Sequence, residues 1–418
     1  MPNTTNNRPS NKVLSSLKFD LPKKYDPLNT ASKPPLELTY SFDPTAIAKL
    51  NLGQSGWSAF SDVQKQAVRD ALAEYATYIN VKYVESSGGG DIDLAFGRTS
   101  LGSDGLGGFE WRAGKSFFDL DSYAIFDTSQ PLTDDYGQHL ILHEIGHGMT
   151  LKHPGKYDGG DEAPFLHKSK DNNKYSAMSY RDNPDSGERA DHLMLYDIAA
   201  LQSRFGANLH HRTGDDVYTV PDGRLEVIWD AGGTDTIDGS GYASALAIDL
   251  RDGRFTSLGQ KDNFAIAFGV VIEDAKGGSG DDRLTGNKWG NTLDGGAGND
   301  VLNGGKGADM LTGGPGSDAF VFNAKPGSGR DTITDFDPGA DTIRLDRDAF
   351  KAIGGKGMLG ESKFHVGARA EDARDRIVYD AEAGLLIHDR NGSDPGKAKV
   401  FAVIDPGLDI GAGVFIVI

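Results

Sequence analysis

The segment HEIGHGMTLKHP, residues 143–154, carries three histidines and a glutamate within eleven residues. Residues four apart on a helix project from the same face, so His143 and His147 can both reach one metal ion. Glu144 is turned partly aside and can address a water on the metal rather than the metal itself. The Pro-Gly pair that follows His153 forces the chain away from the helix, which can bring His153 to the same ion. Three neutral nitrogens and one open position predict a single catalytic Zn²⁺.

The spacing of these residues resembles HExxHxxGxxH, the pattern of the metzincin metalloproteases. An HExxH motif alone also occurs by accident in helices, and a lone methionine usually packs in a core. Here the extended motif is followed by YSAMSY at 175–180, which resembles the Met-turn beneath the zinc in that clan, with Met178 as its structural methionine. The combination favours a zinc site over a chance HExxH motif and over a methionine that only packs in a core.

Thr150 stands where the metzincin pattern has glycine. Glycine suits a helix end that turns at positive φ, and a β-branched residue adopts that conformation at a cost of about 1–2 kcal/mol. Two outcomes are open: Thr150 accepts the strain, or Gly148 loosens the final helical turn. In both cases we expect zinc to be retained and Thr150 to cost stability rather than chemistry.

The elements that must position this motif predict an α/β or α+β catalytic domain at residues 38–208. The helix over 60–79 has a capping box from Ser61 and Gln64. Residues 1–37 are polar, and either a flexible N-terminal tail or a short inhibitory pro-segment fits them. The remaining expected elements are strands at 36–42, 79–85 and 91–96, a helix that begins near 135, and a helix over 191–206.

Charge and composition exclude several classes of function. The chain has 418 residues, a formal net charge of -18 and no cysteine. The acidic balance argues against a nucleic-acid partner. The missing thiols exclude disulfides, a cysteine nucleophile and thiolate-bound zinc. No apolar run is long enough to span a membrane, and the N-terminus shows no Sec-type signal.

From Gly277 the sequence falls into five nine-residue repeats, and four of them match G-G-x-G-x-D-x-U-x, a calcium-binding β-helix repeat. Glycine turns point carbonyls inward, and the sixth-position aspartate supplies a carboxylate to a hard cation. Strict spacing argues against a low-complexity linker. We expect a shared core of Leu284, Leu293, Leu302, Leu311 and Phe320. The expected Ca²⁺ ligands of the repeats are Gly278, Gly280, Asp282, Gly295, Gly296, Gly298, Asp300, Gly304, Gly305, Gly307, Asp309, Gly313, Gly314, Gly316 and Asp318.

Each repeat is a turn plus a short strand, so two repeats make one coil. Calcium is therefore expected to bridge repeats two apart, which pairs Asp282 with Asp300, Asp300 with Asp318, and position 291 with Asp309. Asn291 replaces the aspartate of the second repeat, so we expect the weakest calcium site there.

A zinc motif followed by such repeats, without cysteine, resembles the serralysin family of secreted bacterial zinc metalloproteases with a C-terminal RTX calcium-binding β-roll. The resemblance runs from about residue 36 to the C-terminus. It is carried by DYGQHLILHEIGH, HPGKYDGG, YSAMSY, YDIAALQSRFGAN and WDAGG. It implies an α+β metzincin-type catalytic domain, then an all-β parallel β-roll or β-sandwich RTX domain over 209–418 with a C-terminal secretion signal.

The resemblance also implies an activity, that of a secreted endopeptidase of broad specificity. Glu144 is then the general base, and Tyr180 is a phenol that binds zinc at rest and stabilises the oxyanion. The implied partners are protein or peptide substrates, a type I secretion exporter and a small proteinaceous inhibitor, and the chain is expected to be a monomer. Further implied calcium ligands are Arg212, Gly214, Asp216, Asp230, Gly232, Gly233 and Asp235 at a first site, Val271 and Glu273 at the next, and Asp335 and Asp341 after the repeats.

The C-terminus departs from the family pattern, since GAGVFIVI lacks the acidic residue that usually precedes the apolar end. That departure leaves export by the type I route open. The alternative function is a non-catalytic RTX calcium-binding adhesin or binding protein with a decayed zinc site.

Overall fold

A computed structural model of the chain describes residues 9–21, 23, 26–87, 91–113, 118–219, 225–393 and 396–418. The chain forms two compact units. The first comprises Met1–Thr213, Leu225–Ala231 and Ala267–Val270, and the second comprises Gly214–Arg224, Gly232–Ile266 and Val271–Ile418. The sequence analysis placed the domain boundary at residue 208. The two short segments Leu225–Ala231 and Ala267–Val270 lie beyond that residue in the sequence but belong to the first unit.

A five-stranded sheet forms the base of the first unit, in the order β2-β1-β3-β5-β4. Strand β1 pairs in parallel with β2 and β3, β3 pairs in parallel with β5, and β4 runs antiparallel to β5 at the edge. The strands are β1 (Leu36–Ser41), β2 (Val81–Glu85), β3 (Leu94–Thr99), β4 (Gly105–Ala113) and β5 (Phe118–Asp127).

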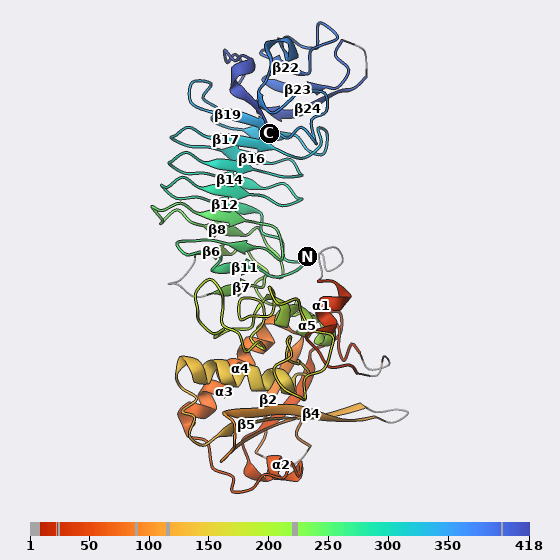
Figure 1. Cartoon of the computed structure of the whole chain (residues 1–418), viewed down its shortest axis with the longest axis vertical. Coiled ribbons are helices and arrows are strands. Elements are labelled where there is room, and N and C mark those ends of the chain that lie inside the picture. Colours follow the sequence, from red (N-terminus) through yellow and green to blue (C-terminus); the bar gives the residue numbers. More distant parts are fainter. Residues whose placement is uncertain are drawn as a thin grey trace. The chain divides into compact units, whose positions relative to one another are not determined.

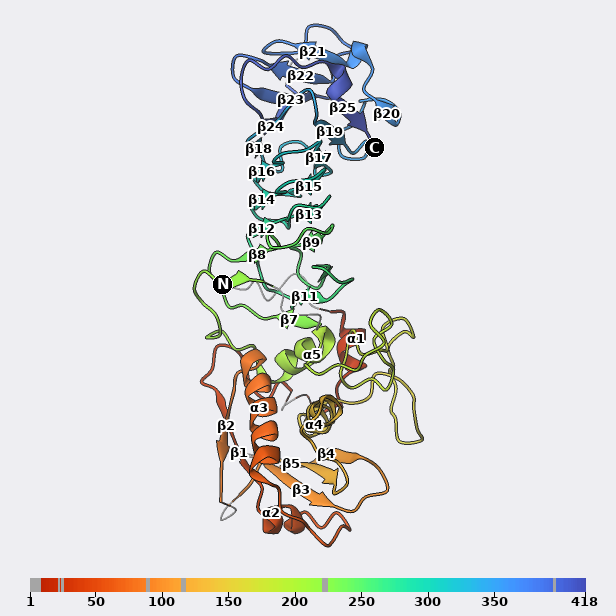
Figure 2. The same ribbon diagram turned by 90° about the vertical axis from the view of Figure 1, so that its left-hand side faces the viewer.

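Helices cover both faces of this sheet (Figures 1 and 2). One face carries α3, against β2, and α4, against β4 and β5, while α2 packs against β3 on the other face. Alternate residues of β3 serve the two faces: Leu94 lies next to Gly148 of α4, and Ala95 packs with Ile47 of α2. The helices are α1 (Asn11–Ser15), α2 (Pro44–Lys49), α3 (Asp62–Tyr78), α4 (Asp135–Gly148) and α5 (Leu195–Phe205).

Most expected elements of the first unit are present with shifts of a few residues. The capping box of α3 is formed as predicted, with Ser61 and Gln64 each accepting from the other's backbone N–H. Helix α5 begins at Leu195, four residues later than expected, and α1, α2, β4 and β5 were not foreseen. The last two matter most, because they form the edge of the sheet that faces α4.

The repeats of the second unit form two stacked sheets of parallel strands. The sheets lie one behind the other in Figure 1 and side by side in Figure 2. One sheet contains β8, β12, β14, β16 and β18, and the other contains β9, β13, β15, β17 and β19. Asp274 is in register with Thr292, and Thr292 with Met310. A step of 18 residues between paired strands confirms that two nine-residue repeats make one coil.

The core of this roll is the predicted row of eighth-position side chains. Leu284, Leu293, Leu302, Leu311 and Phe320 are all fully buried. The strands of the roll are β6 (Val217–Tyr218), β8 (Thr236–Asp238), β9 (Ala247–Asp249), β12 (Asp274–Lys276), β13 (Arg283–Thr285), β14 (Thr292–Asp294), β15 (Val301–Asn303), β16 (Met310–Thr312), β17 (Ala319–Phe322), β18 (Asp331–Ile333) and β19 (Thr342–Leu345).

The same two sheets continue beyond the repeats with longer, partly antiparallel strands, which lie at the C-terminal end of the roll in Figure 2. They are β20 (Gly357–Met358), β21 (Phe364–Val366), β22 (Ile377–Asp380), β23 (Leu385–Asp389), β24 (Ala398–Val403) and β25 (Phe415–Val417), with 3-10 turns η2 (Glu361–Lys363) and η3 (Ala412–Val414). Three further short strands precede the repeats: β7 (Glu226–Ile228), β10 (Phe255–Thr256) and β11 (Phe264–Ile266). Within the described residues, no helix has both the length and the apolarity of a membrane-crossing segment.

Two neighbouring residues of β16 allow a matched test of the roll core. Leu311 is fully buried, and Met310 is half exposed on the same strand. Leu311→Ala is expected to lower the free energy of unfolding of the roll by about 2–5 kcal/mol, because it leaves a cavity. Met310→Ala should change it by less than about 1 kcal/mol. Denaturant unfolding in saturating calcium measures both, and equal effects would contradict the assigned core.

Candidate metal centre

Helix α4 carries two of the three histidines and is held close to the sheet by glycines of β4. A Cβ on Gly107 would lie 2.2 Å from the carbonyl oxygen of Glu144, and one on Gly105 would lie 2.6 Å from its Oε1. The N-terminus of α4 is fixed by Asp134, which accepts from the backbone N–H of Gly137 at 2.8 Å. Edge strand β4 therefore approaches α4 more closely than any residue with a side chain would permit.

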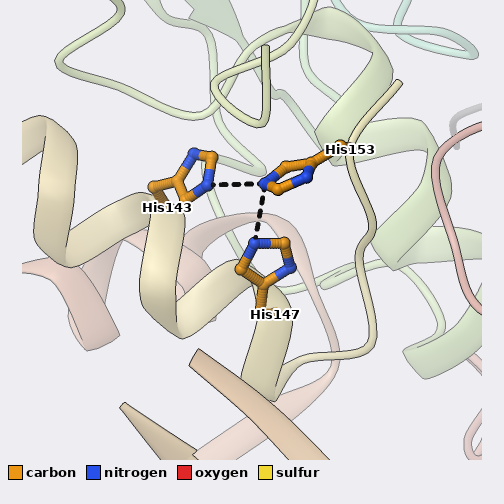
Figure 3. Close-up of side chains that lie close together, drawn as sticks. All are labelled: His143, His147 and His153. Carbon is orange, nitrogen blue, oxygen red and sulfur yellow. Dashed lines mark hydrogen bonds between the residues drawn. The ribbon is translucent and has the colours of Figure 1, made fainter. Parts of the chain in front are cut away.

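Three imidazole nitrogens converge beside this helix (Figure 3). The Nε2 atom of His153 lies 3.2 Å from that of His143 and 3.1 Å from that of His147. Tetrahedral zinc, with Zn–N bonds of about 2.0–2.1 Å, places its nitrogen ligands about 3.3 Å apart. The structure thus brings together all three predicted ligands, in a spacing that fits one zinc ion.

The other ring nitrogen of each histidine has an acceptor that fixes the tautomer. His143 Nδ1 donates to the Ala177 carbonyl at 3.0 Å, and His147 Nδ1 donates to the Leu151 carbonyl at 3.0 Å. His153 Nδ1 donates to Asp161 Oδ1 at 2.6 Å. Carbonyl and carboxylate oxygens only accept, so each Nδ1 carries a hydrogen, and in the neutral form of the ring the lone pair is then on Nε2. Burial also lowers the pKa of His143 well below its usual value and that of His147 to about 4. Both rings are therefore neutral, as a metal ligand requires.

The turn after α4 resolves the question posed by Thr150. Its N–H donates to the His147 carbonyl at 3.0 Å, and the N–H of Leu151 donates to the Gly146 carbonyl at 2.8 Å, which together form a Schellman motif. The left-handed position of that motif is Thr150 itself, with φ of +70°. Thr150 therefore accepts the strain, and the alternative in which Gly148 loosens the last helical turn is wrong.

The segment around Met178 lies beneath the histidines. Met178 is fully buried, and its Sδ occupies the space that a Cβ on Gly146 would enter. Buried Asp197 holds this segment: it accepts from Ser176 Oγ and the Ala177 N–H, each at 2.6 Å. Burial raises the pKa of Asp197 to about 6, against the opposing effect of those hydrogen bonds. Asp197 thus fixes the carbonyl that orients His143.

Glu144, the residue directly after His143, and Tyr180 are the two remaining residues of the predicted centre. Burial raises the pKa of Glu144 to about 8, opposed by the N–H of Gly107. The ring of Tyr180 lies 4.6 Å from that of His153 and stacks on that of Tyr157, also at 4.6 Å. Burial of the phenol raises the pKa of Tyr180 to about 12, so it is a hydrogen-bond donor near neutral pH. A buried carboxyl with a raised pKa therefore lies on the helix of His143 and His147, and a phenol lies against the ring of His153.

The roll contains two rows of carboxylates, one at the turns on each edge. In the first row, the backbone N–H of each residue donates to the carboxylate of the next: Asp282 to Asp300 (2.7 Å), Asp300 to Asp318 (2.8 Å) and Asp318 to Asp341 (2.9 Å). The first two of these pairs are the ones that the sequence predicted calcium to bridge, and the pairing of Asp318 with Asp341 was not predicted. Asp335 accepts from the N–H groups of Gly313 and Gly314, and its charge helps to raise the pKa of both Asp318 and Asp341, after burial, which is the main cause.

The second row includes a residue that the sequence analysis missed. The N–H of Asn291 donates to Asp309 Oδ1 at 2.9 Å, and that of Asp309 donates to Asp331 Oδ1 at 3.1 Å. Asp331 follows Asp309 by 22 residues instead of 18, so a strict nine-residue count passes over it. Its local context, GRDTI at 329–333, keeps the G-x-D-x-U part of the repeat and could have identified it.

The aspartates of the roll suit a hard cation. One carboxylate oxygen of Asp300, Asp309 and Asp318 is buried without a hydrogen-bond partner. Burial raises the pKa of Asp300 to about 7 and those of the other two to about 6. The turns around them also depend on glycine, since a Cβ on Gly316 would lie 1.6 Å from the carbonyl oxygen of Gly298. Buried, unsatisfied carboxylates beside inward carbonyls fit Ca²⁺.

The remaining predicted calcium residues differ in how they are placed. Within the second unit, the N–H of Asp216 donates to Asp235 Oδ1, and the N–H of Asp235 donates to Glu273 Oε2, both at 2.9 Å. The carbonyl of Glu273 accepts from the Asn291 amide, also at 2.9 Å. The calcium roles of these residues stay predictions, as do those of Arg212, Gly214, Asp230, Gly232, Gly233 and Val271.

Comparison with known proteins gives consistent matches. Residues 207–354 match the family model described as Peptidase M10 serralysin C terminal. Over 345 residues the chain is 40% identical to Serralysin G of Dickeya chrysanthemi, covering 74% of this chain and 72% of that protein. It is 38% identical over 349 residues to Metallopeptidase AprA of Pseudomonas marginalis (74% and 73%). It is 34% identical over 338 residues to Serralysin of Proteus mirabilis (68% and 67%).

The contact between His153 and Asp161 leads to a prediction about zinc affinity. In the native chain, the carboxylate of Asp161 accepts from the backbone N–H groups of Tyr157 and Asp158 as well as from His153. Asp161→Asn removes the negative charge and replaces one of these accepting oxygens with an NH₂ group, which cannot accept. Loss of such an outer-shell partner typically weakens metal binding about 10–100-fold. Competition with a zinc-binding dye measures the change. Exposed Glu162 is the control, and an equal loss in Glu162→Gln would reject the role of Asp161.

Proposed function

The chain belongs to the serralysin family of metallopeptidases, and we propose that it is a secreted, zinc-dependent endopeptidase that hydrolyses peptide bonds of proteins with broad specificity. The observation that carries this proposal is the convergence of three histidine Nε2 atoms at distances that fit one zinc ion, with Glu144 on the same helix as two of them and the Tyr180 ring against His153. His143, His147 and His153 would hold one Zn²⁺. The first unit is then a metzincin-type catalytic domain, with Met178 in its Met-turn.

The residues around the metal position have distinct proposed roles. When bound, Zn²⁺ supplies a Lewis acid that polarises the scissile carbonyl and acidifies water. Glu144 takes a proton from the attacking water, whose oxygen forms the new bond to the carbonyl carbon. As the C–N bond breaks, Glu144 returns that proton to the leaving nitrogen. The Tyr180 phenol donates a hydrogen bond to the oxyanion that forms between these two steps.

The burial of Glu144 supports its role as the base. The residue is 6% exposed and the pKa of its carboxyl is raised by desolvation, so it binds a proton more readily than a surface glutamate. A bound cation would act in the opposite direction and keep the carboxylate ionised until water supplies the proton. These opposing influences bring the pKa of Glu144 into the range where its carboxyl can both accept and release a proton.

A non-catalytic adhesin with a decayed zinc site is the competing function. Family membership favours the peptidase, and so does the presence of every group that hydrolysis needs. In the peptidase, several Ca²⁺ ions stabilise the roll without taking part in catalysis. We further propose export by a type I exporter through the C-terminal segment, a monomeric state, and regulation by a small proteinaceous inhibitor.

Replacement of the base gives the central test. Glu144→Gln is expected to keep one zinc per chain and to lower kcat/KM on casein about 10²–10⁴-fold, the usual cost of losing a general base. The exposed Glu361→Gln should leave kcat/KM unchanged. Hydrolysis rates together with zinc content by atomic absorption decide the result. Near-native turnover in a fully zinc-loaded Glu144→Gln protein would reject the proposed role.

The calcium proposal has its own test at one turn of the roll. Extracellular calcium modules bind at about 10⁻⁴–10⁻³ M, so the roll should gain β structure over that range in a circular-dichroism titration of the full chain. Asp300→Asn should shift the midpoint to higher calcium, because it removes a buried carboxylate oxygen. Asp281→Asn is the matched control, since Asp281 is exposed and accepts a hydrogen bond that an asparagine can also accept. A calcium-independent β spectrum would contradict the proposal.

A further inference from the structure

Thr150 is held at positive φ by contacts of all its polar groups. Its N–H donates to the His147 carbonyl at 3.0 Å, and its carbonyl accepts from the Phe19 N–H at 3.0 Å. Its Oγ1 accepts from Arg204 Nη1 at 2.8 Å. Thr150 is itself buried. Rotation to a negative φ would break the last two of these contacts together.

Arg204 comes from α5 and is among the most deeply buried side chains of the chain, at 1% exposure. Besides Thr150, its guanidinium donates to the carbonyl of Phe19 at 2.6 Å and lies 3.5 Å from a carboxylate oxygen of Asp26. A buried cation is costly unless it is paired and hydrogen-bonded. These partners of the Arg204 guanidinium belong to the turn after α4 and to the N-terminal segment.

Residues 17–19 of that N-terminal segment run antiparallel to the turn. Lys18 forms a bridge with Leu151, in which the Lys152 N–H donates to the Leu17 carbonyl at 2.9 Å. Leu17 is fully buried, and the ring of Phe19 packs edge-on against Phe109 of β4 at 5.4 Å. The segment is thus packed on both the turn and the edge strand.

The turn determines where two of the zinc ligands point. The carbonyl of Leu151, the residue directly after Thr150, accepts from His147 Nδ1 and fixes that ring. His153 follows two residues later, so the direction of the chain at Thr150 sets its approach to the other nitrogens. A change at Thr150 therefore reaches His147 and His153 through the backbone.

We propose that Arg204 is a positioning residue for the metal centre. By binding Thr150 and Phe19 at once, it holds Thr150 in the left-handed conformation that a glycine would adopt unaided. It thereby keeps His147 and His153 in place for zinc. This inference rests on the proposed zinc site and adds a residue from a different helix, together with residues 17–19, to what the site needs.

Two substitutions at one position separate this role from general stability. Thr150→Val keeps the β-branched side chain and its strain but removes the oxygen that Arg204 binds. Thr150→Gly removes the oxygen and the strain together. We expect Thr150→Val to weaken zinc binding by about 10–100-fold, the range for losing a partner outside the ligand set. Thr150→Gly should bind zinc within about threefold of the native chain, since the motif forms without help.

A double-mutant cycle tests Arg204 directly. Arg204→Leu should weaken zinc binding in the native chain and should have a much smaller effect in Thr150→Gly. The measurement is the zinc dissociation constant of the calcium-saturated full chain, by dye competition, with thermal unfolding recorded in parallel. If Arg204→Leu fails to fold, the Val and Gly variants of Thr150 still decide the question.

The outcomes are distinct. Weak zinc binding in Thr150→Val with near-native binding in Thr150→Gly supports the proposal. A lower Tm in Thr150→Val and Arg204→Leu with unchanged zinc affinity would overturn it, because Arg204 would then serve stability alone. A native chain that binds no zinc would overturn the proposed function instead.

Discussion

The metal centre depends on three fixed acceptors that bind the Nδ1–H groups of its histidines. Without them each imidazole could rotate or change tautomer, and the Nε2 lone pairs would not point to one place. Each acceptor comes from a different part of the first unit. The Ala177 carbonyl belongs to the segment held by Asp197, and the Leu151 carbonyl belongs to the turn after α4. Asp161 belongs to the loop beyond His153. The site is therefore as precise as these three supports allow, and α4 alone would not define it.

The parts that sequence could predict are those with a short period. A four-residue spacing identified the ligand face of α4, and a nine-residue spacing identified the coils of the roll and their buried leucines. The parts it missed depend on contacts between distant residues. Asp197 holds the segment beneath His143 from twenty residues away, and Gly107 admits α4 to an edge strand whose first half is mostly glycine. Asp331 was missed for a different reason, because four extra residues displace it from the strict repeat.

Burial has opposite effects on the charges of the two groups of candidate metal ligands, the histidines of the first unit and the aspartates of the roll. At the histidine centre, burial removes protons from imidazoles and leaves neutral nitrogen donors, which suit zinc. In the roll, burial works against the carboxylates and raises the pKa of Asp300 to about 7, so a cation is needed to keep them ionised. A metal-free histidine centre can thus stay folded as a neutral cluster, whereas a metal-free roll must either protonate its aspartates or open. This difference supports the proposal that calcium acts on folding of the roll and zinc on the chemistry.

The N-terminal segment is better described by its packing than by either reading of residues 1–37. A flexible tail does not fit residues 9–21, where α1 packs against α5 and Leu14, Leu17 and Leu21 are buried. A removable pro-segment that included Leu17 and Phe19 would leave the Lys152 N–H and the Thr150 carbonyl without their partners and would uncover a buried guanidinium. Unsatisfied buried groups of this kind typically cost about 1–3 kcal/mol each, on top of the strain already present at Thr150. Any processing that preserves the metal centre should therefore cut upstream of Leu17.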